Sequence, residues 1–74
     1  MIEENIFLEK IRRRIKEIRK EKGITMQELA DHSNVSKGLI CQIEKGVSRP
    51  SLHMLLRIIN SLDVDLNIFF NQLH

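Results

Sequence analysis

Apolar residues recur three or four positions apart over most of the chain, which is the spacing that places side chains on one face of a helix. The first stripe predicts a helix from about Ile6 to Lys22, closed by Gly23 in a left-handed conformation. Its inward residues are Phe7, Ile11, Ile15 and Ile18. Shorter stripes with the same spacing follow, so the pattern predicts an all-α protein.

Two short amphipathic segments, separated by a tight polar turn, follow this first helix. Thr25 can accept a hydrogen bond from the backbone three residues on, and Glu28 can reach back to the Thr25 N–H, which is the capping box that begins a helix. The break falls at Ser33 and Asn34, because Asn tolerates a left-handed backbone. Ser36 then caps the next helix. Two short helices joined by such a turn predict a helix-turn-helix.

The second of these helices is expected to have one buried and one exposed face. Ile40 and Ile43 lie three residues apart and point inward. The opposite face is polar and basic, and contains Lys37, Gly38, Cys41, Gln42 and Lys45. This face is the candidate binding surface.

The C-terminal third predicts a loop and two further helices. Gly46 to Pro50 forms the loop, because Pro50 cannot donate a backbone hydrogen bond. The helix that follows begins at Ser51, and its predicted apolar face consists of Leu52, Leu55, Leu56, Ile59 and Leu62. Asp65 is placed to cap the last helix.

The last helix carries more apolar side chains than a short helix can bury, Ile68 among them. We therefore expect an exposed apolar patch that a second copy of the chain covers, giving a homodimer. The predicted interface residues are Leu66, Phe69, Phe70 and Leu73.

The length of the chain limits the number of domains, and its charge distribution indicates the kind of partner. A chain of 74 residues, 42% of them hydrophobic, has room for one domain over residues 1–74. The net charge is only +2, but residues 10 to 22 contain eight Lys or Arg and two Glu, whereas the first nine residues contain three Glu and no base. Beside a helix-turn-helix, such a basic segment is typical of a DNA-binding surface.

The sequence gives little support for a disulfide, a metal site, catalysis or a membrane span. One Cys excludes an intramolecular disulfide, and His32, His53 and His74 lack metal-ligand spacing, so no metal or cofactor is expected. The sequence has no Gly-rich phosphate loop and no acid–base pair, so we do not expect an enzyme. No apolar run is long enough to span a membrane and the N-terminus is acidic, which predicts a cytoplasmic protein.

Four runs in the sequence, GITMQELA, NVSKGLICQIEKG, RPSLHMLLRI and LDVDLNIFF, resemble the Cro and phage-repressor type of helix-turn-helix domain, the XRE family. The resemblance covers roughly residues 11 to 72. It implies a compact fold of five helices, of which the second and third form the DNA-reading unit. It also implies a structural ion pair between Arg19 and Glu44, which ties the first helix to the end of the recognition helix.

The chemistry of DNA suggests roles for the polar side chains. In the major groove, Lys37 could donate to guanine and Gln42 could pair with adenine, while Gly38 would let the helix approach closely. Phosphates are bound by cations, polar side chains and helix N-termini. The candidates for backbone contacts are Arg14, Lys16, Thr25, Gln27, Ser36, Lys45 and Arg49.

These observations predict a sequence-specific regulator of transcription that binds double-stranded DNA. We expect a repressor that binds a palindromic operator as a dimer, with two recognition helices about 34 Å apart in successive major grooves. The alternative is a protein-interaction module on the same scaffold, such as an antitoxin, with Phe69, Phe70 and Leu73 anchoring a different chain. The two functions are compatible.

Overall fold

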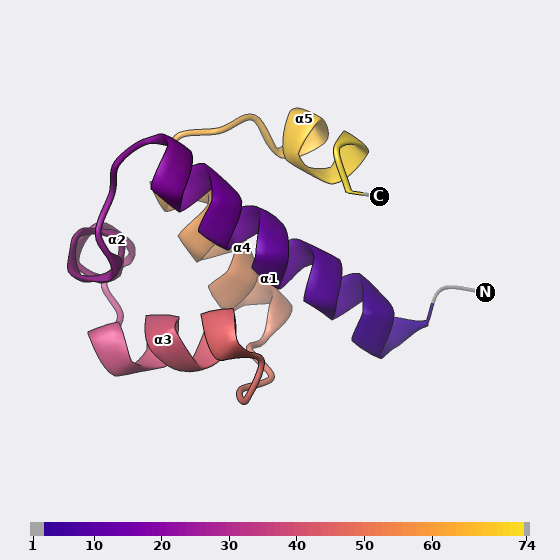
Figure 1. Ribbon diagram of the computed structural model, residues 1–74, viewed down its shortest axis with the longest axis horizontal. Helices are drawn as coiled ribbons and strands as arrows, with labels where there is room; N and C mark the ends of the chain where they lie inside the picture. The colour runs from indigo at the N-terminus through magenta and orange to yellow at the C-terminus, as the bar shows by residue number, and fades with distance from the viewer. Residues whose placement is uncertain (1–2, 74) are drawn as a thin grey trace.

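The computed structural model describes residues 3–73, so His74 lies outside the described residues. Within this range the chain forms five α-helices: α1 (Glu4–Glu21), α2 (Met26–Ser33), α3 (Lys37–Lys45), α4 (Leu52–Ser61) and α5 (Leu66–Asn71). In Figure 1, α1 crosses the front of the molecule, with α4 behind it, α3 below it and α5 above it. The predicted all-α, five-helix fold is confirmed.

Each helix begins at a polar N-cap side chain that accepts a backbone N–H. The N-caps are Glu3, Thr25, Ser36, Ser51 and Asp65. The capping box at α2 is complete, since the Glu28 N–H donates to Thr25 Oγ1 and the Thr25 N–H donates to Glu28 Oε1, both at 3.0 Å. These two residues fix where α2 begins.

The turn between α2 and α3 depends on a left-handed residue. Asn34 has φ +58°, as expected, and its N–H donates to the carbonyls that end α2. Val35 follows and packs against the core. The turn thereby sets the angle between the two helices of the helix-turn-helix.

The core is formed by the inward faces of all five helices. The buried apolar residues are Ile11, Ile15, Ile18, Leu29, Ala30, Ile40, Ile43, Leu55, Ile58, Ile59, Leu62 and Phe69. On α4 the predicted face is partly wrong: Leu52 is 67% exposed, whereas Ile58, which we did not include, is fully buried. Leu52 is the first residue of α4 and lies beside the exposed loop, beyond the reach of the neighbouring helices.

The assignment of Phe69 to a dimer interface is also wrong. Its side chain is only 1% exposed and belongs to the chain's own core. Phe70 packs edge-to-face on Phe69, with ring centroids 5.2 Å apart, and stacks on Phe7 of α1 at 6.4 Å. Because α5 covers α1 in this way, Leu66, Phe70 and Leu73 are partly buried, and Ile68, at 56% exposed, is the large apolar side chain of α5 that faces outward.

None of the helices in the described part of the chain is long and apolar enough to cross a membrane.

Candidate nucleic-acid interface

The outward side of α3 is polar and accessible. Lys37, Gly38, Gln42 and Lys45 are all exposed, and we call these four residues the α3 face. Behind them, Ile40 and Ile43 are buried in the core, on the helix that packs against α1 and α2. The residues predicted to read bases thus share one exposed surface on a helix held firmly by the core.

Gly38 has no structural role that the fold requires. A Cβ built at this position would meet only Ser36 Oγ, at 3.9 Å, and its backbone is helical. Glycine costs about 1 kcal/mol relative to alanine in a helix interior. The open space in front of Gly38 is consistent with close approach of a partner to α3.

Arg19 and Glu44 form the expected ion pair, which is bidentate. Arg19 Nε donates to Glu44 Oε2 at 2.7 Å and Nη2 donates to Oε1 at 3.0 Å, while Nη1 donates to the carbonyl of Ile24 at 2.9 Å. The side chains are only 9% and 2% exposed. The hydrogen bond to Glu44 raises the pKa of Arg19 although burial opposes the charge. Both groups therefore position α3 against α1.

The candidates for DNA-backbone contacts near α3 are exposed, but several already have partners in the chain. Thr25 belongs to the capping box, and Gln27 donates to Asp31 at 2.9 Å. Ser36 Oγ accepts from the Leu39 N–H at 3.0 Å and caps α3. Lys16 and Lys45 are exposed on α1 and α3. These residues lie on α1 and on the two helices of the helix-turn-helix and its caps, and all of them are exposed.

Arg49 comes from the loop between α3 and α4 and is held by the start of α1. Its guanidinium lies 3.6 Å from Glu4 Oε1 and donates a hydrogen bond to Asn5 Oδ1. The Arg49 and Glu4 side chains are 64% and 74% exposed, so water competes for this contact.

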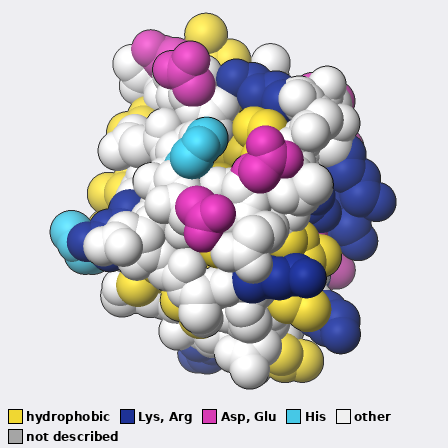
Figure 2. All heavy atoms as spheres, turned by 90° about the vertical axis from the view of Figure 1, so that its left-hand side faces the viewer, with side chains coloured by type: hydrophobic (Ala, Val, Ile, Leu, Met, Phe, Trp, Pro, Cys, Tyr) yellow, Lys and Arg dark blue, Asp and Glu magenta, His cyan; other side chains and the backbone are white. Residues whose placement is uncertain are grey.

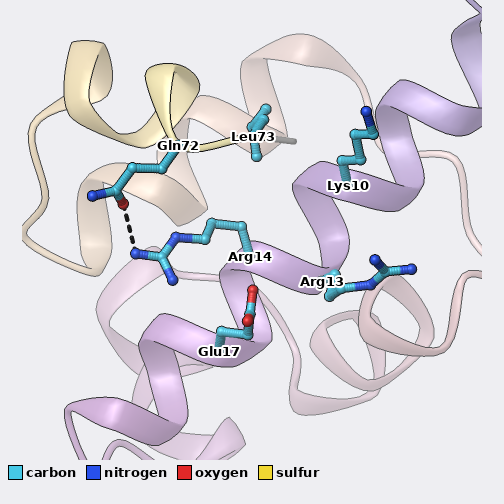
Figure 3. Close-up of a pocket in the computed structure, with 6 residues that line it drawn as sticks. All are labelled: Lys10, Arg13, Arg14, Glu17, Gln72 and Leu73. Carbon is cyan, nitrogen blue, oxygen red and sulfur yellow. Dashed lines mark hydrogen bonds between the residues drawn. The ribbon is translucent and has the colours of Figure 1, made fainter.

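Arg14 does not lie where we predicted. Its Nη2 donates to Gln72 Oε1 at 2.6 Å and its Nη1 lies 3.6 Å from Glu21 Oε1, which places the guanidinium between α1 and α5 (Figure 3). It lines an open pocket of about 410 Å³ together with Lys10, Arg13, Glu17, Gln72 and Leu73. Since α3 packs on the other side of α1, the assignment of Arg14 to the DNA backbone is wrong.

Arg12 is the residue of α1 that sequence reasoning missed. Its guanidinium lies directly over Gly46, the residue that ends α3, within 2.7 to 2.9 Å of the place where a Cβ would stand. Gly46 has φ +78° and no side chain, which makes room for this approach. The seven-residue spacing from Arg12 to Arg19 puts both on the α3 side of α1 and was the available signal.

The charges are unevenly distributed over the surface. Figure 2 shows the side of the molecule on which α2 lies: carboxylates occupy its middle and upper parts, whereas most Lys and Arg side chains lie along the edge toward α1. Among residues 3–73, no group of three or more His, Cys, Asp or Glu side chains is placed to hold a metal ion. The site is a polar and cationic surface.

Helices α2 and α3 form a helix-turn-helix, and α3, the second helix of this unit, has an exposed polar face. These features define the class of helix-turn-helix proteins. Residues 15–69 match the HTH_3 helix-turn-helix family, and the chain belongs to this XRE-type family. The matched segment begins within α1, so about three turns of that helix, from Glu4 to Arg14, precede it.

Named relatives share this segment. The chain is 35% identical over 65 residues to the HTH-type transcriptional regulator SinR of Bacillus subtilis (strain 168), covering 86% of this chain and 59% of SinR. It is 39% identical over 62 residues to SlrR of the same organism, covering 82% of this chain and 41% of SlrR. The chain thus spans less than two thirds of the length of these regulators.

Solved structures match over most of both chains. The wild-type restriction-modification controller protein C.Esp1396I has a TM-score of 0.87 and 36% identity, with 90% of this chain and 86% of that chain covered. The same protein as a tetramer in complex with its natural 35 base-pair operator gives a TM-score of 0.86, with 90% and 88% covered. The likeness extends over all five helices.

Proposed function

We propose that this protein is a sequence-specific, double-stranded DNA-binding regulator of transcription that acts as a repressor at a palindromic operator. The observation that carries the proposal is the α3 face, four exposed polar or glycine residues on a helix whose other side is buried. A helix of this kind fits the major groove, where base edges present donors and acceptors. Lys37 is suited to guanine O6 and N7, and Gln42 to adenine N6 and N7.

The groups around the α3 face provide phosphate contacts. A helix in the major groove has a phosphate backbone along each side, and cations or helix N-termini that reach it fix the orientation without reading sequence. Lys16, Lys45 and Arg49 supply cations, and Ser36 marks the N-terminus of α3. Steep dependence of affinity on salt follows from such contacts.

A dimer is the proposed binding unit. Two copies related by a two-fold axis would present two recognition helices about 34 Å apart, which demands an inverted repeat. Operator binding by a tetramer of C.Esp1396I supports an oligomer, and the exposed Ile68 on α5 offers apolar surface for the contact. A different protein chain bound at that same surface, as in an antitoxin, is the second candidate, and the same exposed side chain favours it.

Selection from a random duplex library at physiological salt tests the proposal, because weak non-specific binding is suppressed there. We expect an inverted repeat to be enriched. The variant Lys37→Ala/Gln42→Ala should then lose preference for that repeat by about 1 to 3 kcal/mol per lost base contact, while keeping its melting temperature. If well-folded protein enriched no motif, the regulator function would be abandoned in favour of the protein partner.

A further inference from the structure

The position of Arg12 is unusual among the arginines of α1. Arg13 lies 3.4 Å from Glu9, and Arg14 and Arg19 have the partners described above. Within residues 3–73, by contrast, neither a hydrogen bond nor an ion pair engages the Arg12 guanidinium. The residue is half-buried, and its guanidinium packs over Gly46 while its donors stay unused within the described residues.

Gly46 fixes where this unpaired cation sits. The guanidinium carbon lies 2.7 Å from the Cβ position of Gly46, and Nε and Nη2 lie 2.9 Å from it. Arg12 thus covers the C-terminal end of α3, where the helix dipole also favours a cation. On the other side of the same loop, Arg49 projects from the segment that leads into α4.

This location coincides with the expected path of a DNA strand. If α3 lies in the major groove, the elements packed against it come nearest to the phosphate backbones on its two sides, and α1 is one of these elements together with α2 (Figure 1). Arg12, unlike Arg14, is on the side of α1 that faces α3. A guanidinium held in advance with free donors suits a phosphate, which it can contact with two hydrogen bonds.

We propose that Arg12 is a phosphate-binding residue that fixes the protein on the DNA backbone at the C-terminal end of the recognition helix. The inference rests on the proposed DNA-binding function. Arg12 lies in the three turns of α1 that precede the segment shared with the HTH_3 family, so this contact is an addition to the shared helix-turn-helix. Gly46 contributes by leaving room for the guanidinium.

The neighbouring Arg13 offers a matched control. Arg12→Gln and Arg13→Gln remove the same charge from adjacent positions, but Arg13 is exposed, paired with Glu9 and turned about 100° away around the helix. Affinity would be measured by fluorescence anisotropy over a series of salt concentrations, on the selected operator and on an unrelated duplex. Melting curves by circular dichroism would establish that both variants are folded.

For Arg12→Gln we expect roughly tenfold weaker binding to either duplex, and a salt slope lower by about one, because a phosphate contact reads no sequence. Arg13→Gln should change the salt slope by less than half as much. Arg12→Lys keeps the positive charge, so it should have the salt slope of the wild-type protein. Equal effects of Arg12→Gln and Arg13→Gln would overturn the assignment.

The test also separates this inference from the proposed function. If the wild-type protein bound duplexes without sequence preference and Arg12→Gln still lowered the slope, the regulator function would fail and the role of Arg12 would stand. If the wild-type protein bound no duplex even at low salt, both would fail.

Discussion

Helices α3 and α5 both present surfaces suited to a partner, but they do so in opposite ways. The surface of α3 is polar, lies opposite a buried apolar face and is supported by the Arg19–Glu44 ion pair. The surface of α5 is apolar, and much of it is used within the chain, where Phe69 fills the core and Phe70 stacks on α1. Polar residues that surround a core stay available for a partner, whereas apolar residues are shared between the core and any interface.

The clearest way to test this comparison is to substitute neighbouring residues of α5. Phe69→Ala should destabilise the folded monomer by about 3 to 5 kcal/mol, because it removes a fully buried aromatic side chain and leaves a cavity. In a domain whose total stability is on the order of 5 to 15 kcal/mol, this is the largest effect that we expect. Urea unfolding at low protein concentration would measure it.

Ile68 provides the control for that experiment. Ile68→Ser changes an exposed residue on the same helix, so monomer stability should change little, while the proposed dimer should dissociate at lower concentration. Sedimentation velocity over a concentration series would follow the dissociation. If instead Phe69→Ala left the free energy of unfolding of the monomer unchanged and weakened only the association, α5 would be an interface helix. The core of the monomer would then end at α4.

A second test concerns the support of α3. Glu44→Ala should destabilise the protein by about 3 kcal/mol, because the buried guanidinium of Arg19 would keep the Ile24 carbonyl but lose both carboxylate hydrogen bonds. Thermal unfolding followed by circular dichroism would show a lower midpoint. Glu44→Gln retains one acceptor and the shape of the side chain, so its midpoint should lie between those of the wild-type protein and Glu44→Ala. An unchanged midpoint for Glu44→Ala would mean that water already solvates the pair.

Local features of the fold were predictable from the sequence because their causes lie within a few residues. The caps at Thr25, Ser36 and Asp65 and the left-handed Asn34 depend only on neighbouring backbone groups. The prediction of the inward face of α4 was less accurate, because helical periodicity gives the angle of a residue around the helix axis but not its position along the neighbouring helices. Leu52 has a suitable angle and nevertheless lies beyond the core.

The candidate site was predictable to a similar degree. On α3 only one side is apolar, so the polar residues can occupy only the outer face. Basic residues occur on several sides of α1, and the sequence does not say which side α3 covers and which side α5 covers. The placements of Arg12 over Gly46 and of Arg14 beside Gln72 follow from that long-range packing.

The smallest effect that we predict concerns the capping box that starts the helix-turn-helix. Hydrogen bonds from the Thr25 backbone N–H, and then from its side chain, hold the pKa of Glu28 below its ordinary value of 4.5. A carboxyl whose pKa is lowered by folding adds stability above its unfolded pKa, and this stability is lost as the pH falls through its folded pKa.

Glu28→Gln tests the charge separately from the shape, because a glutamine amide can still accept the Thr25 N–H. The wild-type protein should be slightly more stable than the variant at pH 7, and the difference should shrink as the pH is lowered below 4.5 and the carboxyl becomes protonated in the folded state as well. Urea unfolding at pH 7 and at a series of acidic pH values would measure it. A difference that persisted in acid would assign the stabilisation to side-chain geometry, and α2 would then begin at Thr25 without help from the Glu28 charge.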